Sequence, residues 1–143
     1  MFDPKRVING TFGSLFINGE QVTEVTGLKA DVALNYMDVL VCGKLEPGKK
    51  LSGTTRNGNI VMHKANSRMA KMISDDIKAG KTPEFTLVSN LDDPDSYGAE
   101  RVVLKGVKFT QLTLADWTAG QAGSINQPFT FDDWDFLDMI DNN

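Results

Sequence analysis

The segment TGLKADVALNYMDVLVC, residues 26 to 42, decides how this sequence can fold, because apolar and polar side chains alternate along it. The apolar positions of its first part share one parity: Leu28, Ala30, Val32, Leu34 and Tyr36. Since successive side chains of a strand point to opposite faces, this pattern predicts a β-strand with one buried face. After Tyr36 the apolar positions shift by one residue, to Met37, Val39 and Val41. The shift predicts a bulge or a change of packing partner.

The length of this strand limits where it can lie. A strand from Thr26 to Cys42 would be about 55 Å long at roughly 3.3 Å per residue. A compact domain of this chain length is only about 37 Å across. The strand therefore either bends sharply at the shift or projects toward another subunit. The next segment, Gly43 to Gly53, holds three glycines, one proline and three lysines, which is typical of a mobile loop.

Other segments predict further strands around this one. Asn18-Gly19 lies between two alternating stretches and tolerates the positive φ angles of a tight hairpin turn. Further strands are expected at residues 54 to 63, 84 to 91, 99 to 105, 107 to 114 and 121 to 131. Pro128 lacks an N–H group, so we expect the last of these strands at an edge. The fold class is thus mainly β.

One amphipathic helix is expected between these strands. Asn66 or Ser67 is its predicted N-cap, and Gly80 is the expected C′ residue. The apolar residues at helical spacing are Met69, Met72, Ile73 and Ile77. Because a lone helix beside a sheet must bury its apolar face, this stripe predicts core packing rather than a ligand groove. The expected architecture is a β-sandwich or barrel with one flanking helix and a long protruding hairpin loop.

Composition predicts one soluble domain over residues 1 to 143. Hydrophobic residues make up 41% of the chain and charged residues 24%, as in ordinary globular proteins. No apolar run approaches the roughly 20 residues of a membrane helix, and the N-terminus lacks the apolar region of a signal peptide. Cys42 is the single cysteine, and no Cys or His cluster has metal-ligand spacing. We expect no metal and no cofactor.

The formal charge of −4 is concentrated at the C-terminus. Residues 129 to 143 hold five aspartates and no cation, so the rest of the chain carries +1. Because affinity for a phosphate backbone needs clustered Lys and Arg, we expect no nucleic-acid binding. Large apolar residues alternate with these acids. The segment either packs back on its own domain or lies across a neighbouring subunit, since it must be covered.

Three short patterns resemble catalytic or ion sites without completing them. Residues 43 to 50 lack the final Ser or Thr of a nucleotide-binding P-loop and do not lead into a helix. The acidic turn at residues 92 to 95 lacks the ligand spacing of an EF-hand, so we expect its Asp side chains to bond nearby backbone N–H groups. His63 is the only histidine, and nothing fixes it near Cys42. No catalytic residue is therefore assigned.

Several segments together resemble one known family. They are Asn66-Ser67-Arg68-Met69, Pro83-Glu84-Phe85, Leu91 to Gly98 with the sequence LDDPDSYG, Ala99-Glu100-Arg101-Val102, Leu112 to Trp117 with the sequence LTLADW, and Pro128-Phe129-Thr130-Phe131. In this order and spacing they resemble the tail-tube proteins of contractile phage tails and of phage-tail-like bacteriocins from Gram-positive bacteria, the diffocin and PBSX-like type. The resemblance covers most of the chain and is weakest at residues 43 to 58.

The resemblance implies a structural subunit without enzymatic activity. Six copies would form a ring, and stacked rings would form a hollow tube inside a contractile sheath, with baseplate and tail terminator proteins at its ends. Phage DNA would pass through the lumen without specific binding, if the particle is a phage. Assembly would take place in the bacterial cytoplasm and end in a virion tail or a released particle. The alternatives are a small β-sandwich ligand-binding module and a hydrolase, although Trp117 and Trp134 do not share one strand face as a ligand platform would require.

Three groups of residues are candidates for assembly contacts. The loop that reaches the adjacent ring in this family corresponds to Gly43, Lys44, Leu45, Glu46, Pro47, Gly48, Lys49, Lys50 and Leu51. A wall that lets DNA slide should be polar and poor in lysine, which suggests Thr54, Asn57 and Asn59 as lumen-facing residues, although Arg56 lies in the same segment. The extended terminal segments, residues 1 to 12 and 129 to 143, come second, with Phe129, Phe131, Trp134, Phe136 and Leu137 as interface candidates.

Overall fold

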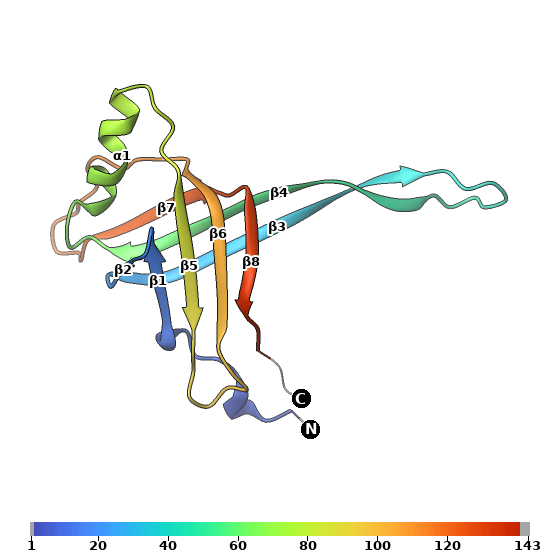
Figure 1. Ribbon diagram of the computed structural model, residues 1–143, viewed down its shortest axis with the longest axis horizontal. Helices are drawn as coiled ribbons and strands as arrows, with labels where there is room; N and C mark the ends of the chain where they lie inside the picture. Colours follow the sequence, from blue (N-terminus) through green and yellow to red (C-terminus); the bar gives the residue numbers. More distant parts are fainter. Residues whose placement is uncertain (1, 141–143) are drawn as a thin grey trace.

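A computed structural model describes residues 2–140, which form a mostly β structure with one α-helix (Figure 1). The strands are β1 (Gly13–Ile17), β2 (Glu20–Val22), β3 (Val25–Val39), β4 (Gly48–His63), β5 (Phe85–Leu91), β6 (Glu100–Phe109), β7 (Ser124–Thr130) and β8 (Asp133–Asp138). The helix α1 spans Arg68–Lys78, and two short 3-10 turns, Pro4–Arg6 and Gly10–Phe12, precede β1. The expected fold class, with its flanking helix and protruding hairpin, is confirmed.

The strands form two sheets that share β6. Sheet A has the order β2-β1-β5-β6-β8, and sheet B contains β3, β4, β7 and the end of β6, with antiparallel pairing throughout. Figure 1 shows the strands of sheet A running across those of sheet B, an orthogonal packing in which a bent strand makes the corner.

The corner lies at Gly106. This residue has a φ of 64°, a region that favours glycine, and a Cβ there would clash with Asp132. The sequence predicted two strands, at residues 99 to 105 and 107 to 114. That prediction was wrong, because one strand passes through Gly106 and ends at Phe109.

The core lies between the two sheets and is built from inward-facing residues of the strands, together with Met69 and Ile73 of α1. Its buried members are Leu15, Ile17, Val22, Ile60, Met62, Met69, Ile73, Phe85, Leu87, Leu104, Val107, Phe129 and Phe131. Aromatic rings run through it in sequence from Phe85 to Phe109, Phe129, Phe131 and Trp134, with centroids 5.2 to 6.3 Å apart. Tilted and edge-on ring pairs of this kind add about 0.5–1.5 kcal/mol each to area burial.

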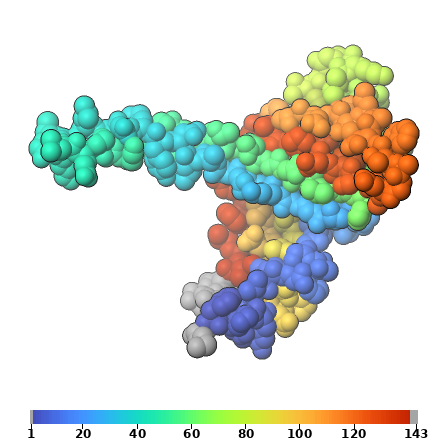
Figure 2. All heavy atoms as spheres, turned by 180° about the vertical axis from the view of Figure 1, so that it is seen from behind, coloured from blue at the N-terminus to red at the C-terminus, as the bar shows by residue number. Residues whose placement is uncertain are grey.

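The β3–β4 hairpin is longer than the core and projects from it (Figures 1 and 2). It pairs continuously from Val25 opposite Met62 to Val39 opposite Gly48. The predicted shift near Tyr36 is confirmed as a bulge, and the extra residue, Ser52, lies on the partner strand. The expected loop at residues 43 to 53 is too long, because Gly48 to Gly53 belong to β4 and only residues 40 to 47 connect the strands.

Pro128 does not mark an edge strand. β7 pairs with β4 along its length and with β6 at Phe129 and Thr130, so the edge prediction was wrong. The pairing with β6 stops just before the proline. The carbonyl of Pro128 accepts a hydrogen bond from the Thr110 N–H. Because the pairing with β6 ends here, the missing N–H of the proline does not break a hydrogen bond of the sheet.

Helix α1 begins and ends as predicted but buries less than predicted. The Asn66 side chain accepts from the Arg68 N–H at 3.0 Å, and Gly80 follows the helix with a φ of 73°. Met69 and Ile73 are buried, whereas Ile77 is exposed. The contacts with the core therefore come from the first two turns of α1, and the prediction that Ile77 is buried was wrong.

An ion pair joins α1 to the turn between β2 and β3. The Arg68 Nε lies 3.0 Å from Glu24 Oε1, and its Nη1 lies 3.4 Å from Glu20 Oε1. The Glu24 side chain is only 8% exposed. Burial raises the pKa of Glu24, but hydrogen bonds from a backbone N–H and from Arg68 outweigh it, so the pKa is lowered.

Gly58 is the position in β4 where a side chain fits worst. A Cβ there would lie 2.5 Å from the Lys29 carbonyl oxygen and closer still to the Phe129 ring. We expect Gly58→Ala to lower the free energy of unfolding by about 1–3 kcal/mol, measured by urea denaturation. Gly53→Ala in the same strand is the matched control, because a Cβ there meets nothing within 4 Å. Equal stabilities of the two variants would contradict this packing.

The Glu24–Arg68 pair should make stability depend on pH. Because the folded-state pKa of Glu24 is lowered, its contribution is present above the unfolded pKa of about 4.3 and is lost as pH falls through the folded value. We expect Glu24→Gln to lower the free energy of unfolding at pH 7 by about 1–3 kcal/mol. The gap to wild type should narrow as the pH falls below the unfolded pKa of about 4.3. Glu46→Gln, on the exposed hairpin turn, is the control and should change neither value.

Candidate assembly surfaces

The part of the β3–β4 hairpin beyond the core, residues 34 to 53, is called the arm. Within the domain, Leu28 and Val32 of β3 pack against the core. On the arm the same face continues with nothing over it, and carries Leu34, Tyr36 and Leu51, each about half exposed. Tyr36 and Leu51 are direct cross-strand partners, so the three side chains form one apolar stripe. This face of sheet B is longer than sheet A can cover.

The tip of the arm, residues 40 to 47, is also apolar and exposed. Leu40 is 88% exposed, and Leu45 is fully exposed. All nine residues expected to contact the adjacent ring, Gly43 to Leu51, lie on the arm and are exposed. Lys49 forms an ion pair with Asp38 on the opposite strand. Residues 43 to 50, which partly match the P-loop pattern, therefore form the end of a hairpin. They lead into β4 and not into a helix.

The outer face of sheet B is polar and close to neutral. Asn57 and Asn59 lie on it, opposite Asp31 and Lys29, whose charged groups are 3.5 Å apart. Asn126, Pro128 and Thr130 continue this face on β7. Two of the three expected lumen-facing residues therefore share one surface.

Thr54 does not share that surface. It pairs with Leu34 and has the parity of the core face, so its grouping with Asn57 and Asn59 was wrong. Arg56 has the same parity as Thr54. Its guanidinium lies 4.9 Å from the Trp134 ring centroid and donates to the Asp132 carbonyl. Arg56, the cation that did not suit a polar lumen wall, therefore points to the opposite side of sheet B from Asn57 and Asn59.

The C-terminal segment packs back on its own chain. β8 pairs with β6, and two lysines of β6 bind its acids. Lys105 Nζ lies 2.6 Å from Asp135, and Lys108 Nζ lies 3.0 Å from Asp132. The hydrogen bonds that the two lysines donate to these carboxylates raise the pKa of both lysines. The first alternative for this segment is confirmed for the described residues; residues 141 to 143 lie outside them.

The five terminal interface candidates differ in how far they are exposed. Phe129 is 1% exposed and Phe131 is buried beside it, so both belong to the core of the chain and offer no contact surface. Trp134 is partly buried between Phe131 and Arg56. Only Phe136, which is 48% exposed, and Leu137 remain available to a neighbour. The alternation of apolar and acidic residues from Asp133 to Phe136 was the signal that could have predicted β8.

The N-terminal segment is tied down by the acidic turn after β5. The Asp93 carboxylate is buried and accepts from the Asn9 N–H at 2.8 Å and from the Asp95 N–H at 2.9 Å. The Arg6 guanidinium lies 5.0 Å from the Tyr97 ring centroid. The expectation that Asp side chains bond backbone N–H groups is confirmed. Residues 2 to 12 are therefore not a free extension, and Met1 lies outside the described residues.

No catalytic or metal-binding constellation assembles in the part of the chain that the structure describes. Within it, no group of three or more His, Cys, Asp or Glu side chains could hold a metal ion. His63 ends β4 at the base of the hairpin, whereas Cys42 lies at the arm tip. No helix of residues 2–140 has the length and apolar character needed to cross a membrane.

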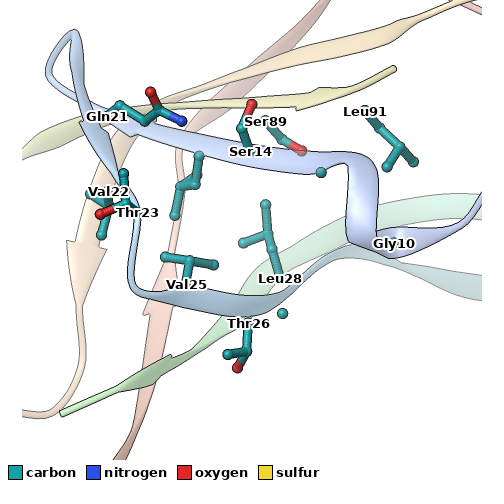
Figure 3. Close-up of a pocket in the computed structure, with 13 residues that line it drawn as sticks. Gly10, Ser14, Gln21, Val22, Thr23, Val25, Thr26, Leu28, Ser89 and Leu91 are labelled. Carbon is teal, nitrogen blue, oxygen red and sulfur yellow. The ribbon is translucent and has the colours of Figure 1, made fainter. Parts of the chain in front are cut away.

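A groove of about 510 Å³ opens between β1 and the start of β3 (Figure 3). Figure 3 shows Val25 and Leu28 pointing from β3 into the space below β1, while Thr26 points away. The sheets meet at the β6 corner on one side, and this groove marks their open side. It was not predicted, because no local pattern records how two sheets separate.

Comparison with known proteins gives one consistent result. Residues 1–138 match the family described as phage tail tube protein. The chain is 33% identical over 138 residues to the phage-like element PBSX protein XkdM of Bacillus subtilis (strain 168), covering 95% of this chain and 94% of the relative.

Solved structures of low sequence identity share the fold. The sheath/tube terminator of the extracellular contractile injection system PVC, in the extended state, has a TM-score of 0.75 at 9% identity and covers 92% of this chain and 96% of that chain. The sheath-tube complex of the same kind of system gives 0.72 at 11% identity and covers 92% of each chain.

Substitutions can separate core from surface among the terminal aromatics. We expect Phe129→Ala to lower the free energy of unfolding by about 3–5 kcal/mol, because it leaves a cavity beside Phe109 and Phe131. Phe136→Ser should cost about 1 kcal/mol or less, since half of its side chain is already in water. Urea denaturation of the monomer measures both. A larger loss for Phe136→Ser than for Phe129→Ala would contradict these assignments.

Proposed function

The chain belongs to the phage tail tube protein family, and from that premise we propose how its surfaces build the tube. It is a structural subunit of a contractile-type tail tube, and its fold is that of tube proteins of contractile systems. In our proposal six copies close into a ring, and rings stack into a hollow tube. The observation that carries the proposal is the arm, which extends one sheet beyond the core that should cover it.

Ring closure would join the edges of sheet B. β3 has no strand partner on its outer side among residues 2–140, and β7 meets β6 only at its last two residues. Neighbouring strands lie side by side in the hydrogen-bonding direction. Copies joined from the β3 edge to the β7 side would therefore form a closed barrel, in which no edge stays unpaired. Such an interface is heterologous and closes by rotation.

The direction in which the arm points then identifies the copy of the chain that it contacts. If copies join sideways across the strands, the arm, which runs along the strands, points out of the ring plane. It would reach a copy in the next ring, and its apolar stripe of Leu34, Tyr36 and Leu51 would be covered there. This supports residues 43 to 51 as inter-ring contacts.

The outer face of sheet B would line the lumen. Asn57 and Asn59 present uncharged amides, and the Lys29–Asp31 pair neutralises itself. A wall without clustered cations releases few counterions from DNA and binds it weakly. Phage DNA would therefore slide through without being held, if the particle carries DNA.

The remaining parts of the proposal concern partners and compartment. Residues 1 to 143 would act as one tube domain without catalytic activity, with the contractile sheath outside and baseplate and tail terminator proteins at the ends. Solved relatives of the fold include a sheath/tube terminator and a sheath-tube complex, which supports these partner classes. Assembly would occur in the bacterial cytoplasm, before the tube becomes part of a virion tail or a released particle.

Shortening the arm tests the proposal. Residues 37 to 50 are replaced by Asn-Gly, which can bridge the cross-strand partners Tyr36 and Leu51 as a two-residue hairpin turn. We expect the shortened chain to keep the circular dichroism spectrum and monomer stability of wild type, because the arm makes no core contact. Electron microscopy at high protein concentration should show tubes for wild type and none for the variant.

Two results would count against the proposal. Long tubes from the shortened chain would refute the role of the arm in stacking. Strictly monomeric particles of wild type under all conditions would contradict assembly altogether, and would favour the alternative of a small ligand-binding module.

A further inference from the structure

The open groove between β1 and β3 is filled by no segment of residues 2–140, and we propose that it receives the arm tip of a copy in the next ring. This inference rests on the proposed stacking of rings and adds the receiving site. The arm tip is residues 40 to 47, and the groove is the space of about 510 Å³ described above.

The groove has the size and lining of a side-chain binding site. Its apolar walls are Val22, Val25, Leu28 and Leu91, and Ser14 and Ser89 add small polar groups. A water molecule takes up about 30 Å³ of liquid, so the groove could hold many waters or several large side chains. The side chains of Val25 and Leu28 face this space (Figure 3). Filling the groove would remove their remaining apolar area from water.

The arm tip supplies apolar side chains that have no cover of their own. Leu40 and Leu45 are almost entirely exposed, and Val41 between them is also exposed. Burying apolar area stabilises by about 25 cal/mol per Å², or about 1.5–3 kcal/mol for one complete Leu or Val side chain. Two or three such residues in one groove would therefore make it the anchor of the contact.

The positions of tip and groove suit a stacked assembly. The groove is formed where β3 begins, and the tip follows the end of β3, about 50 Å away at 3.3 Å per residue. Figure 1 shows the base of β3 and the tip at opposite ends of the molecule. A contact between opposite ends of identical copies is heterologous and does not close by itself, so it repeats along a filament.

Charge favours the same pairing. The arm, residues 34 to 53, carries three lysines and two acids and so has a net charge of +1. Lys49 pairs with Asp38, and Lys44 and Lys50 are the other two lysines of the arm. Leu91 in the groove wall leads directly into the acidic turn, where Asp92 and Asp95 are exposed. Opposite charges across an interface raise the association rate and fix its register.

Cross-linking in assembled tubes tests the inference, because Cys42 is the natural cysteine of the tip. Thr23 lines the groove and is exposed, and Thr23→Cys places a thiol there. Mild oxidation of tubes should join Cys42 of one copy to the new thiol of the next, and a non-reducing gel should show a ladder of covalent oligomers. Ala79→Cys, exposed just after the C-terminal end of α1 and outside the groove, is the matched control.

The gel outcomes are distinct. A ladder for Thr23→Cys that disappears on adding Cys42→Ser, with none for Ala79→Cys, supports the docking. Tubes of Thr23→Cys without a ladder overturn it while leaving the stacked tube intact. Absence of tubes from wild type would instead contradict the proposed function.

Charge reversal gives a second test that leaves the groove lining unchanged. Lys44→Glu with Lys50→Glu, and separately Asp92→Lys with Asp95→Lys, should each slow tube growth by about tenfold or more. The chain with all four substitutions should recover most of the wild-type rate, as followed by light scattering. Failure of the fourfold variant to recover, while each pair alone slows growth, would overturn the assigned contact.

Discussion

The pairing of β3 with β4 beyond the edge of the core is the constraint on which the rest of this structure depends. Hydrogen bonds along the ladder satisfy the backbone of the arm out to Val39 and Gly48, but no second layer covers its side chains. The backbone can therefore be complete within one chain while the packing is not. In the proposed assembly other copies of the chain cover these side chains, and membership of the tail tube family supports this.

Much of this arrangement could be predicted from alternation alone, and the errors arose where one residue broke a local rule. Gly106 ended a predicted strand, yet it is the bend that lets β6 join both sheets. Pro128 was assigned to an edge, but its position where pairing with β6 stops removes the need for its N–H. Thr54 was grouped with Asn57 although strict alternation separates them. Local patterns carry no record of how two sheets meet, so the corner and the groove could not be predicted.

The acids and the aromatic residues of the termini hold this chain together. The sequence predicted that the Asp side chains of the acidic turn bond backbone N–H groups and that the C-terminal segment is covered, but it did not identify their partners. In the structure, Asp93 binds the backbone of the N-terminal segment, and Asp132 and Asp135 bind lysines of β6. Asp93, Asp132 and Asp135 thus each have a partner across the fold. Because these pairs join residues far apart in the sequence, composition showed the excess of acids but not which groups they bind.

The arm also bears on how growth begins. A two-stranded ribbon with no third strand is marginally stable in water by itself. If its tip docks as proposed, a tube end already offers a rigid receiving site, whereas two free subunits must order both partners at once. Adding a subunit to an existing end would then be easier than starting a new ring, and the soluble pool would persist until a seed appears. The onset and number of tubes would thus be set by nucleation, through the same ribbon that holds the rings together.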